Sequence, residues 1–266
     1  MTPSRSAFAF WVFCFSALWL PAAPIGAQEN YEIQVYGAKT VGKGFTVFEL
    51  HSNFTGNGSR SVEGTVLPTN RALHETVEIT HGFSDIFEVG FYLFTAATPG
   101  TGWQFVGSHI RPRIRAPDSW KLPVGLSLSS EFGPVSTKYD ANSWGVELRP
   151  VIDQTLGNFY WAFNPTVGWA LKGADAGKGA SGMIFNPSIK MQWNVSKLIG
   201  VGVEYYGTTG SINRLAPSAE QSHILYPSLD FDFSEDWEFN IGYGIRVAGT
   251  GDHDIVKIII GRRFPF

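Results

Sequence analysis

The sequence has little cysteine and little charge. Its only cysteine, Cys14, lies in an apolar run near the N-terminus, which excludes a disulfide framework and thiol chemistry in the rest of the chain. Charged residues make up 16% of the 266 residues, whereas ordinary soluble domains contain roughly 25%. Because surfaces that face water are normally rich in charge, this scarcity indicates a surface in contact with something other than water.

Long apolar runs and basic patches are missing as well. After the N-terminal region, no segment approaches the roughly 18 consecutive apolar residues that indicate a membrane-spanning helix. The net charge is -3, and no zinc-finger, helix-turn-helix or RNA-binding motif is found, so no nucleic-acid partner is expected. No histidines or acids show metal-ligand spacing, so the sequence predicts no metal site and no cofactor.

The N-terminus has the pattern of a secretory signal peptide. Arg5 precedes an apolar run over residues 7–20, and small residues and proline follow up to Ala27. We therefore predict a signal peptide over residues 1–27 and an exported chain, residues 28–266, that forms one domain because nothing in it resembles a linker.

Alternating hydrophobicity is the main pattern of the exported chain. Segments of about 10 residues with a period of two recur, as expected of strands that cross a membrane. The twelve segments are 44–54, 71–83, 86–95, 103–115, 121–132, 142–152, 158–171, 181–194, 198–209, 221–233, 237–248 and 253–265. The fold class predicted is all-β, an antiparallel transmembrane β-barrel of about twelve strands.

The connections support the barrel over a soluble sandwich. Those after even-numbered segments are tight, such as 84–85 and 195–197, whereas several others are long, such as 55–70 and 210–220. Short turns at one end and long loops at the other are typical of bacterial outer-membrane barrels. The polar segment 28–42 is expected to be a short lead on the periplasmic side, and the sequence assigns it no role.

The C-terminal segment predicts how the barrel closes. One side of the strand over 254–266 carries Val256, Ile258, Ile260, Phe264 and Phe266. Ending on an aromatic residue resembles the C-terminal signature of bacterial outer-membrane barrels. We expect strand 255–266 to pair with 45–54, to be recognised by the barrel assembly machinery, and to lie among outer-membrane lipids. Arg262 falls on the apolar side and is expected to extend toward the rim.

Five prolines lie inside predicted strands: Pro112, Pro150, Pro165, Pro187 and Pro227. Proline removes a ladder donor and is normally found at edges, strand starts or bulges, yet a closed barrel has no edges. We expect a bulge or locally relaxed pairing at each of them.

Acids and bases nearly balance on the inward faces. The candidates for lining the lumen are Glu88, Arg111, Arg113, Glu147, Arg149 and Arg246. They could line an aqueous passage or pair and fill the barrel, and the second role is favoured because enclosed charges must find partners. A turn near Pro99 predicts that Glu88 and Arg111 lie opposite each other on neighbouring strands.

One stretch resembles a known family. The residues His81-Gly82-Phe83-Ser84-Asp85-Ile86-Phe87-Glu88-Val89-Gly90 resemble the strand-turn-strand motif of outer-membrane barrels named for a meta-pathway of phenol degradation. Similar pieces are Leu122-Pro123-Val124-Gly125, Val203-Glu204-Tyr205-Tyr206-Gly207 and residues 236–244. The resemblance implies an outer-membrane barrel that takes up small solutes, hydrophobic or aromatic ones among them.

Catalysis is not expected. An outer-membrane hydrolase needs a Ser-His pair with an orienting acid, or an acid-His dyad. Ser108-His109 and Ser222-His223 are merely adjacent, which puts their side chains on opposite faces of a strand. The sequence therefore favours a porin-like channel or transporter for passive uptake over a structural or surface-interaction barrel, and both over a membrane-embedded hydrolase.

Overall fold

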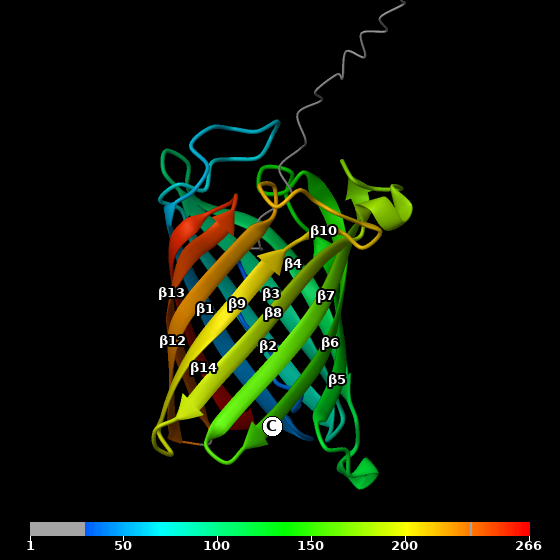
Figure 1. Cartoon of the computed structure of the whole chain (residues 1–266), viewed down its shortest axis with the longest axis vertical. Coiled ribbons are helices and arrows are strands. Elements are labelled where there is room, and N and C mark those ends of the chain that lie inside the picture. The colour runs from blue at the N-terminus through cyan, green and yellow to red at the C-terminus, as the bar shows by residue number, and fades with distance from the viewer. Residues whose placement is uncertain (1–29, 235) are drawn as a thin grey trace, which may run out of the picture.

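The structure is a computed structural model that describes residues 30–234 and 236–266. The predicted signal peptide therefore lies outside the described residues. Twelve long antiparallel strands form a closed barrel (Figure 1). They are β1 (Phe45–Asn57), β2 (Leu73–Ser84), β3 (Phe87–Thr98), β4 (Gly102–Arg115), β5 (Gly125–Pro134), β6 (Asn142–Leu156), β7 (Phe159–Gly173), β8 (Ile184–Asn194), β9 (Ile199–Thr208), β12 (Ser222–Ser234), β13 (Trp237–Gly249) and β14 (His253–Pro265). Each matches one predicted segment to within a few residues, so the predicted fold is confirmed.

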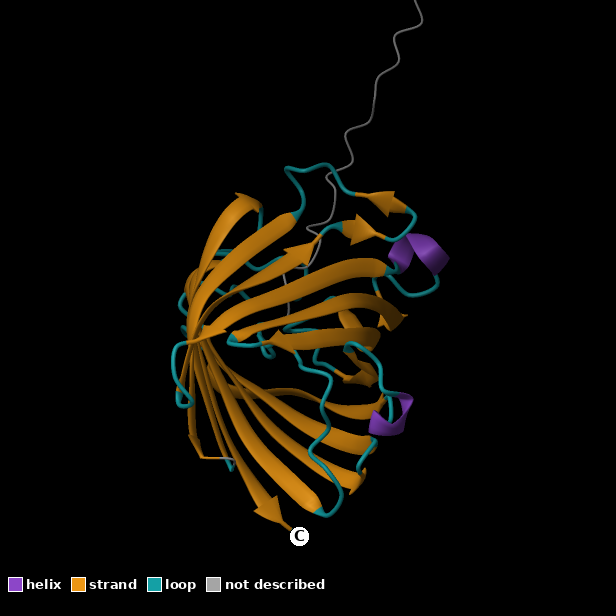
Figure 2. Ribbon diagram, turned by 60° about the horizontal axis from the view of Figure 1, so that its bottom comes forward, coloured by secondary structure: helices purple, strands orange, loops and turns teal. Residues whose placement is uncertain are grey.

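Short elements occupy the connections. A two-residue pair, β10 (Gly210–Ser211) and β11 (Arg214–Leu215), extends from the β9–β12 loop. The 3-10 helices η1 (Asp118–Trp120) and η2 (Gly179–Gly182) also lie in connections, outside the barrel wall (Figure 2). Among the described residues no helix is long and apolar enough to cross a membrane.

The last strand closes the barrel on the first. β14 pairs with β1 from Phe45↔Pro265 through Thr55↔Ile255, and every other long strand pairs with its neighbours in chain order. The predicted closure is confirmed. Because each strand has two partners, no long edge is left with unpaired backbone groups.

The barrel is apolar outside and polar inside. Outward side chains such as Phe48, Leu50 and Phe91 are exposed, whereas Glu78 and Glu204 on the inward face are fully buried. This is the reverse of a soluble domain and is what a lipid-facing wall requires. Arg262 lies on the outer face with its guanidinium 4.9 Å from the ring centroid of Trp237 and 4.8 Å from that of Phe264.

The two ends of the barrel differ. At one end, the short-turn end, strands are joined by 85–86, 116–124, 157–158 and 195–198, and the C-terminus lies there too. At the other, the long-loop end, connections 58–72, 135–141, 174–183 and 209–221 are long, although 99–101 and 250–252 are tight. The predicted asymmetry is thus present, with two short exceptions and one longer connection, 116–124, on the short-turn side.

Four of the five strand prolines interrupt a ladder. Between β6 and β7 pairing stops after Leu148↔Val167 and resumes at Ile152↔Phe163, and Pro150 and Pro165 lie opposite each other in the gap. Pairing is also interrupted at Pro112 on the β5 side and at Pro227 on the β13 side. Neither proline offers an N–H to the β6–β7 ladder, whereas the register continues past Pro165↔Pro187 between β7 and β8. The expected relaxed pairing is therefore confirmed at these four prolines. The expected bulges are not found there, because the register shifts lie at other residues.

Candidate functional site

Residues 30–42, here called the N-terminal segment, run through the lumen from end to end. At the long-loop end the Asn30 side chain donates to Asp252 Oδ2 at 2.8 Å. At the short-turn end the Thr40 hydroxyl donates to the backbone oxygen of Asp85 at 2.8 Å. The expectation of a short lead on the periplasmic side was therefore wrong: the segment lies inside the barrel and spans its length.

Side chains of the wall, and not a β-ladder, hold the segment. Asn164 accepts a hydrogen bond from the Tyr36 N–H at 2.8 Å and donates to the Tyr36 carbonyl at 3.0 Å. Further bonds join Lys257 Nζ to the Ile33 carbonyl (3.1 Å), the Ala38 N–H to Asp153 (3.0 Å) and the Val41 N–H to Glu88 (2.6 Å). The segment therefore takes no part in the strand pairing that forms the barrel wall.

Apolar side chains of the segment account for its place inside the barrel. Ile33 and Val35 pack in a buried cluster with Tyr206, Tyr226 and neighbouring wall residues. Tyr36 and Ala38 pack against Val151 in a second cluster, and each buried apolar side chain contributes roughly 1.5 to 3 kcal/mol. In the sequence, Ile33 and Val35 alternate with Gln34 and Tyr36, but alternation alone does not say what a segment packs against.

Tyr36 lies at the centre of three arginines. Its ring centroid is 4.6 Å from the guanidinium carbon of Arg111, 4.7 Å from that of Arg149 and 5.8 Å from that of Arg113. Its hydroxyl donates to Glu32 and lies 3.1 Å from the hydroxyl of Tyr92. Desolvated cation-π contacts contribute about 2 kcal/mol or more, so Tyr36 anchors the segment in mid-lumen.

Glu88, Arg111 and Arg113 form one buried network with Glu78. Arg113 Nε lies 2.8 Å and Arg111 Nη1 3.7 Å from Glu88 Oε1, and Arg111 Nη2 lies 2.6 Å from Glu78 Oε1. In register, Glu88 is opposite Arg113 and Gly90 is opposite Arg111. The prediction that Glu88 and Arg111 are directly opposed was wrong for two reasons. Thr98 pairs with Gly102, so the turn is centred on Gly100 and not near Pro99, and a register shift at Phe94/Thr95 moves the partner by one more residue.

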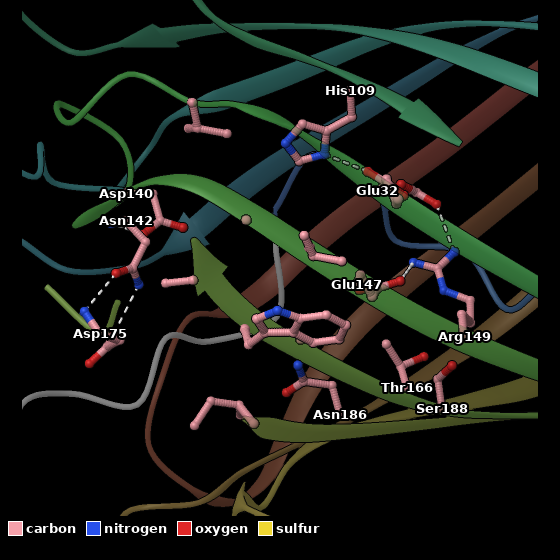
Figure 3. Close-up of a pocket in the computed structure, with 18 of the residues that line it drawn as sticks. Glu32, His109, Asp140, Asn142, Glu147, Arg149, Thr166, Asp175, Asn186 and Ser188 are labelled. Atoms are coloured by element: carbon pink, nitrogen blue, oxygen red, sulfur yellow. Dashed lines mark hydrogen bonds and ion pairs between the residues drawn. The ribbon is translucent and has the colours of Figure 1, made fainter. Parts of the chain in front are cut away.

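The other predicted lining residues divide into two groups. Arg149 binds Glu147 at 2.5 Å and Glu32 of the segment at 2.9 Å (Figure 3). Arg246 lies apart, half-buried near the long-loop end, where it donates to the carbonyl of Gly251. Five of the six candidates therefore surround the segment, and their role in solute passage stays a prediction.

The segment lies between two hollows of the lumen. The outer pocket, of about 240 Å³, opens among the long loops and is lined by the following residues, which Figure 3 labels in part: Glu32, Gln34, His109, Glu131, Asp140, Glu147, Arg149, Thr166, Asp175, Asn186 and Ser188. The inner vestibule, of about 770 Å³, opens at the short-turn end beside connection 116–124. Gln34 lines both hollows, so the segment lies at their boundary.

The outer pocket is acidic. Its acids are Glu32, Glu131, Asp140, Glu147 and Asp175, against Arg149 as the single arginine or lysine. At its mouth, burial raises the pKa of the Asp140 carboxyl, whereas the hydrogen bond from Lys178 lowers the pKa of Asp175. A surplus of negative charge in an enclosed space attracts cations and repels anions.

Two histidines considered for catalysis have hydrogen-bond partners. His109 Nδ1 lies 2.6 Å from Glu131 Oε1, and His223 Nδ1 lies 2.7 Å from the hydroxyl of Tyr205. Ser108 alternates with His109 and belongs to the outward face. The prediction that the protein is not an enzyme stays a prediction.

Comparison with solved structures identifies the type of barrel. No protein-family model matches the sequence, and no curated protein sequence is similar to it at a significant level. The fold is similar to the COG4313 outer membrane channel from Pseudomonas putida F1, with a TM-score of 0.59 and 10% identity over 88% of this chain and 100% of that one. It is also similar to the KdgM porin, with a TM-score of 0.50 and 11% identity over 83% and 99%. The chain therefore has the fold of outer-membrane channel barrels.

Proposed function

We propose that the protein is an outer-membrane channel for the passive uptake of small solutes, closed at rest by its N-terminal segment. The observation that carries the proposal is the position of the segment between the outer pocket and the inner vestibule. Its backbone is bonded to side chains of the wall, so the path can open without loss of any strand pairing. Displacement of a segment that gates a site is a common switching device.

The charges favour small hydrophilic solutes, and cations over anions. Five acids and one arginine line the outer pocket, whereas pockets for apolar ligands are mainly apolar. The resemblance to the phenol-degradation family supports placing the chain among uptake barrels of that family, but the lining gives less support to aromatic or hydrophobic solutes.

The membrane setting is part of the same proposal. The exposed apolar belt suits outer-membrane lipids, and the aromatic C-terminal strand suits recognition by the barrel assembly machinery. In this orientation the long loops, and with them the outer pocket, face the cell exterior.

A closed structural barrel is the second candidate. It is favoured by the ion networks around Tyr36, which fill the middle of the lumen. Liposome swelling distinguishes the two candidates. Proteoliposomes with a variant lacking residues 30–41 should swell faster in small sugars and amino acids than those with the complete exported chain. If neither protein admits any solute, although both show the heat-modifiable migration of folded barrels, the structural barrel is correct.

A further inference from the structure

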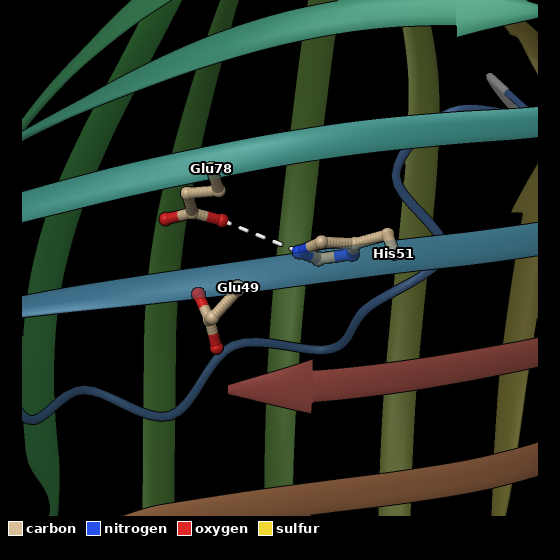
Figure 4. A group of neighbouring side chains, drawn as sticks. All are labelled: Glu49, His51 and Glu78. Carbon is tan, nitrogen blue, oxygen red and sulfur yellow. Dashed lines mark ion pairs between the residues drawn. The ribbon is translucent and has the colours of Figure 1, made fainter. Parts of the chain in front are cut away.

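We propose that Glu49, His51 and Glu78 bind a divalent first-row transition metal ion, such as Zn²⁺, in the lumen. The three side chains project inward from β1 and β2 (Figure 4), and one potential ligand atom from each lies within 4.8 Å of the others. All three residues are buried. Sequence spacing gave no sign of the site because its ligands come from two strands, and it is the register Glu49↔Glu78 that brings them together.

The contact between His51 and Glu78 has the spacing of two metal ligands. His51 Nε2 lies 3.4 Å from Glu78 Oε2, and neither atom has a hydrogen-bond partner among the described residues. Two ligands bound at about 2.0 to 2.1 Å in a tetrahedral arrangement lie about 3.4 Å apart. The ring of His51 is fully buried, and neither of its nitrogens has a hydrogen-bond partner among the described residues. Such burial costs free energy unless another group, here a metal ion, binds a ring nitrogen.

Glu49 supplies the third ligand. Its carboxylate lies beside those of Glu78 and Glu238, and Gly261, opposite Glu49 on β14, leaves room for this approach. Buried carboxylates that face one another need a proton or a cation between them. An imidazole among them favours a transition metal, because Mg²⁺ and Ca²⁺ prefer oxygen ligands alone.

Neighbouring groups already orient Glu78 for this role. Arg111 and the Thr80 hydroxyl both donate to Glu78 Oε1 at 2.6 Å, which leaves Oε2 directed toward His51. Hydrogen bonds to the second oxygen of a ligating carboxylate are the usual support of a metal site. The inner vestibule is lined by Glu49 and Glu78 and gives an ion a route from the short-turn end.

Zinc content tests the proposal. The barrel should be purified without a histidine tag, stripped with EDTA, exposed to Zn²⁺ and freed of unbound metal before measurement by mass spectrometry. We expect one zinc ion per barrel, and affinity at least about tenfold weaker in His51→Asn and in Glu49→Gln. His74→Asn is the matched control, since His74 is a buried histidine on β2 outside the cluster, and it should keep the metal.

Co²⁺ gives a second readout that does not depend on stability. Bound to an imidazole and two carboxylates it should produce visible absorption bands, and these should be lost in His51→Asn. The proposal is overturned if the complete barrel retains no more zinc than His51→Asn while both migrate as folded barrels. The proposal is also overturned if the complete barrel binds no zinc and Glu49→Gln has a higher free energy of unfolding than the parent protein. That result would mean that the carboxylates of Glu49 and Glu78 share a proton and not a metal ion.

Discussion

Asn164 and Tyr36 are hydrogen-bonded to each other in both directions, at 2.8 and 3.0 Å, so that one wall side chain imitates a strand partner for the N-terminal segment. Asn164 lies next to Pro165, within the stretch where the β6–β7 ladder is interrupted. The wall thus binds the segment at a place where the backbone pairing between β6 and β7 is interrupted.

Asn164→Ala should therefore loosen the segment. Loss of two hydrogen bonds of about 1 kcal/mol each shifts a closed-to-open equilibrium by at least about tenfold. Open probability in planar bilayers should rise accordingly. Thr166→Ala, two residues further along the same inward face, is the control and should leave the open probability unchanged. If both variants have the same open probability, Asn164 does not hold the segment in place.

Arg111 should be essential for stability. It lies between Glu78 and Glu88, and its removal leaves two buried carboxylates short of a partner. Breaking a buried pair in this way costs about 3 to 5 kcal/mol. Arg111→Met should lower the free energy of unfolding in urea by that amount, whereas Arg60→Met, at an exposed position in loop 58–72, should change it by less than about 0.5 kcal/mol.

Glu131 and Glu147 should determine charge selectivity. In the variant lacking residues 30–41 we expect a preference for cations, and replacement of both acids by glutamine should reduce the cation-to-anion permeability ratio. Reversal potentials under a salt gradient measure this ratio. The exposed Glu63 provides a control, since Glu63→Gln lies outside the lumen; a ratio that is the same in all three proteins would remove the outer pocket from the solute path.

Barrel closure can be tested by cross-linking, because the predicted exported chain has no cysteine. Leu50 and Ile260 are direct partners on β1 and β14. A Leu50→Cys/Ile260→Cys pair should form a disulfide in the folded barrel, whereas Leu50→Cys with Ile245→Cys on β13 should not. Disulfide formation by the second pair alone would contradict the register.

The sequence was sufficient for the wall of the barrel but not for its contents. Alternation, as in Trp144 to Arg149, assigns each residue to the lipid or the lumen because a strand has a strict period of two. It contains no information on what the inward side chains meet, so the contacts of residues 30–42 and the approach of His51 to Glu78 were not predicted. The pairing of Glu88 with Arg113 was missed because two local details set the register: the turn is centred on Gly100 and not near Pro99, and one bulged residue shifts every pair beyond it.

A disulfide lock on the N-terminal segment tests the central claim most directly. Ala38 Cβ lies 3.0 Å from the position a Cβ would take on Gly125, so the segment must shift outward by somewhat less than about 1 Å to reach the roughly 3.8 Å spacing of a disulfide. The Asp153 side chain must turn aside, so Gly125→Cys alone is the control. In planar bilayers the oxidised Ala38→Cys/Gly125→Cys barrel should not conduct, and a reducing agent should restore the openings seen with the control. An oxidised double variant that conducts as well as its reduced form would contradict closure of the path by the segment.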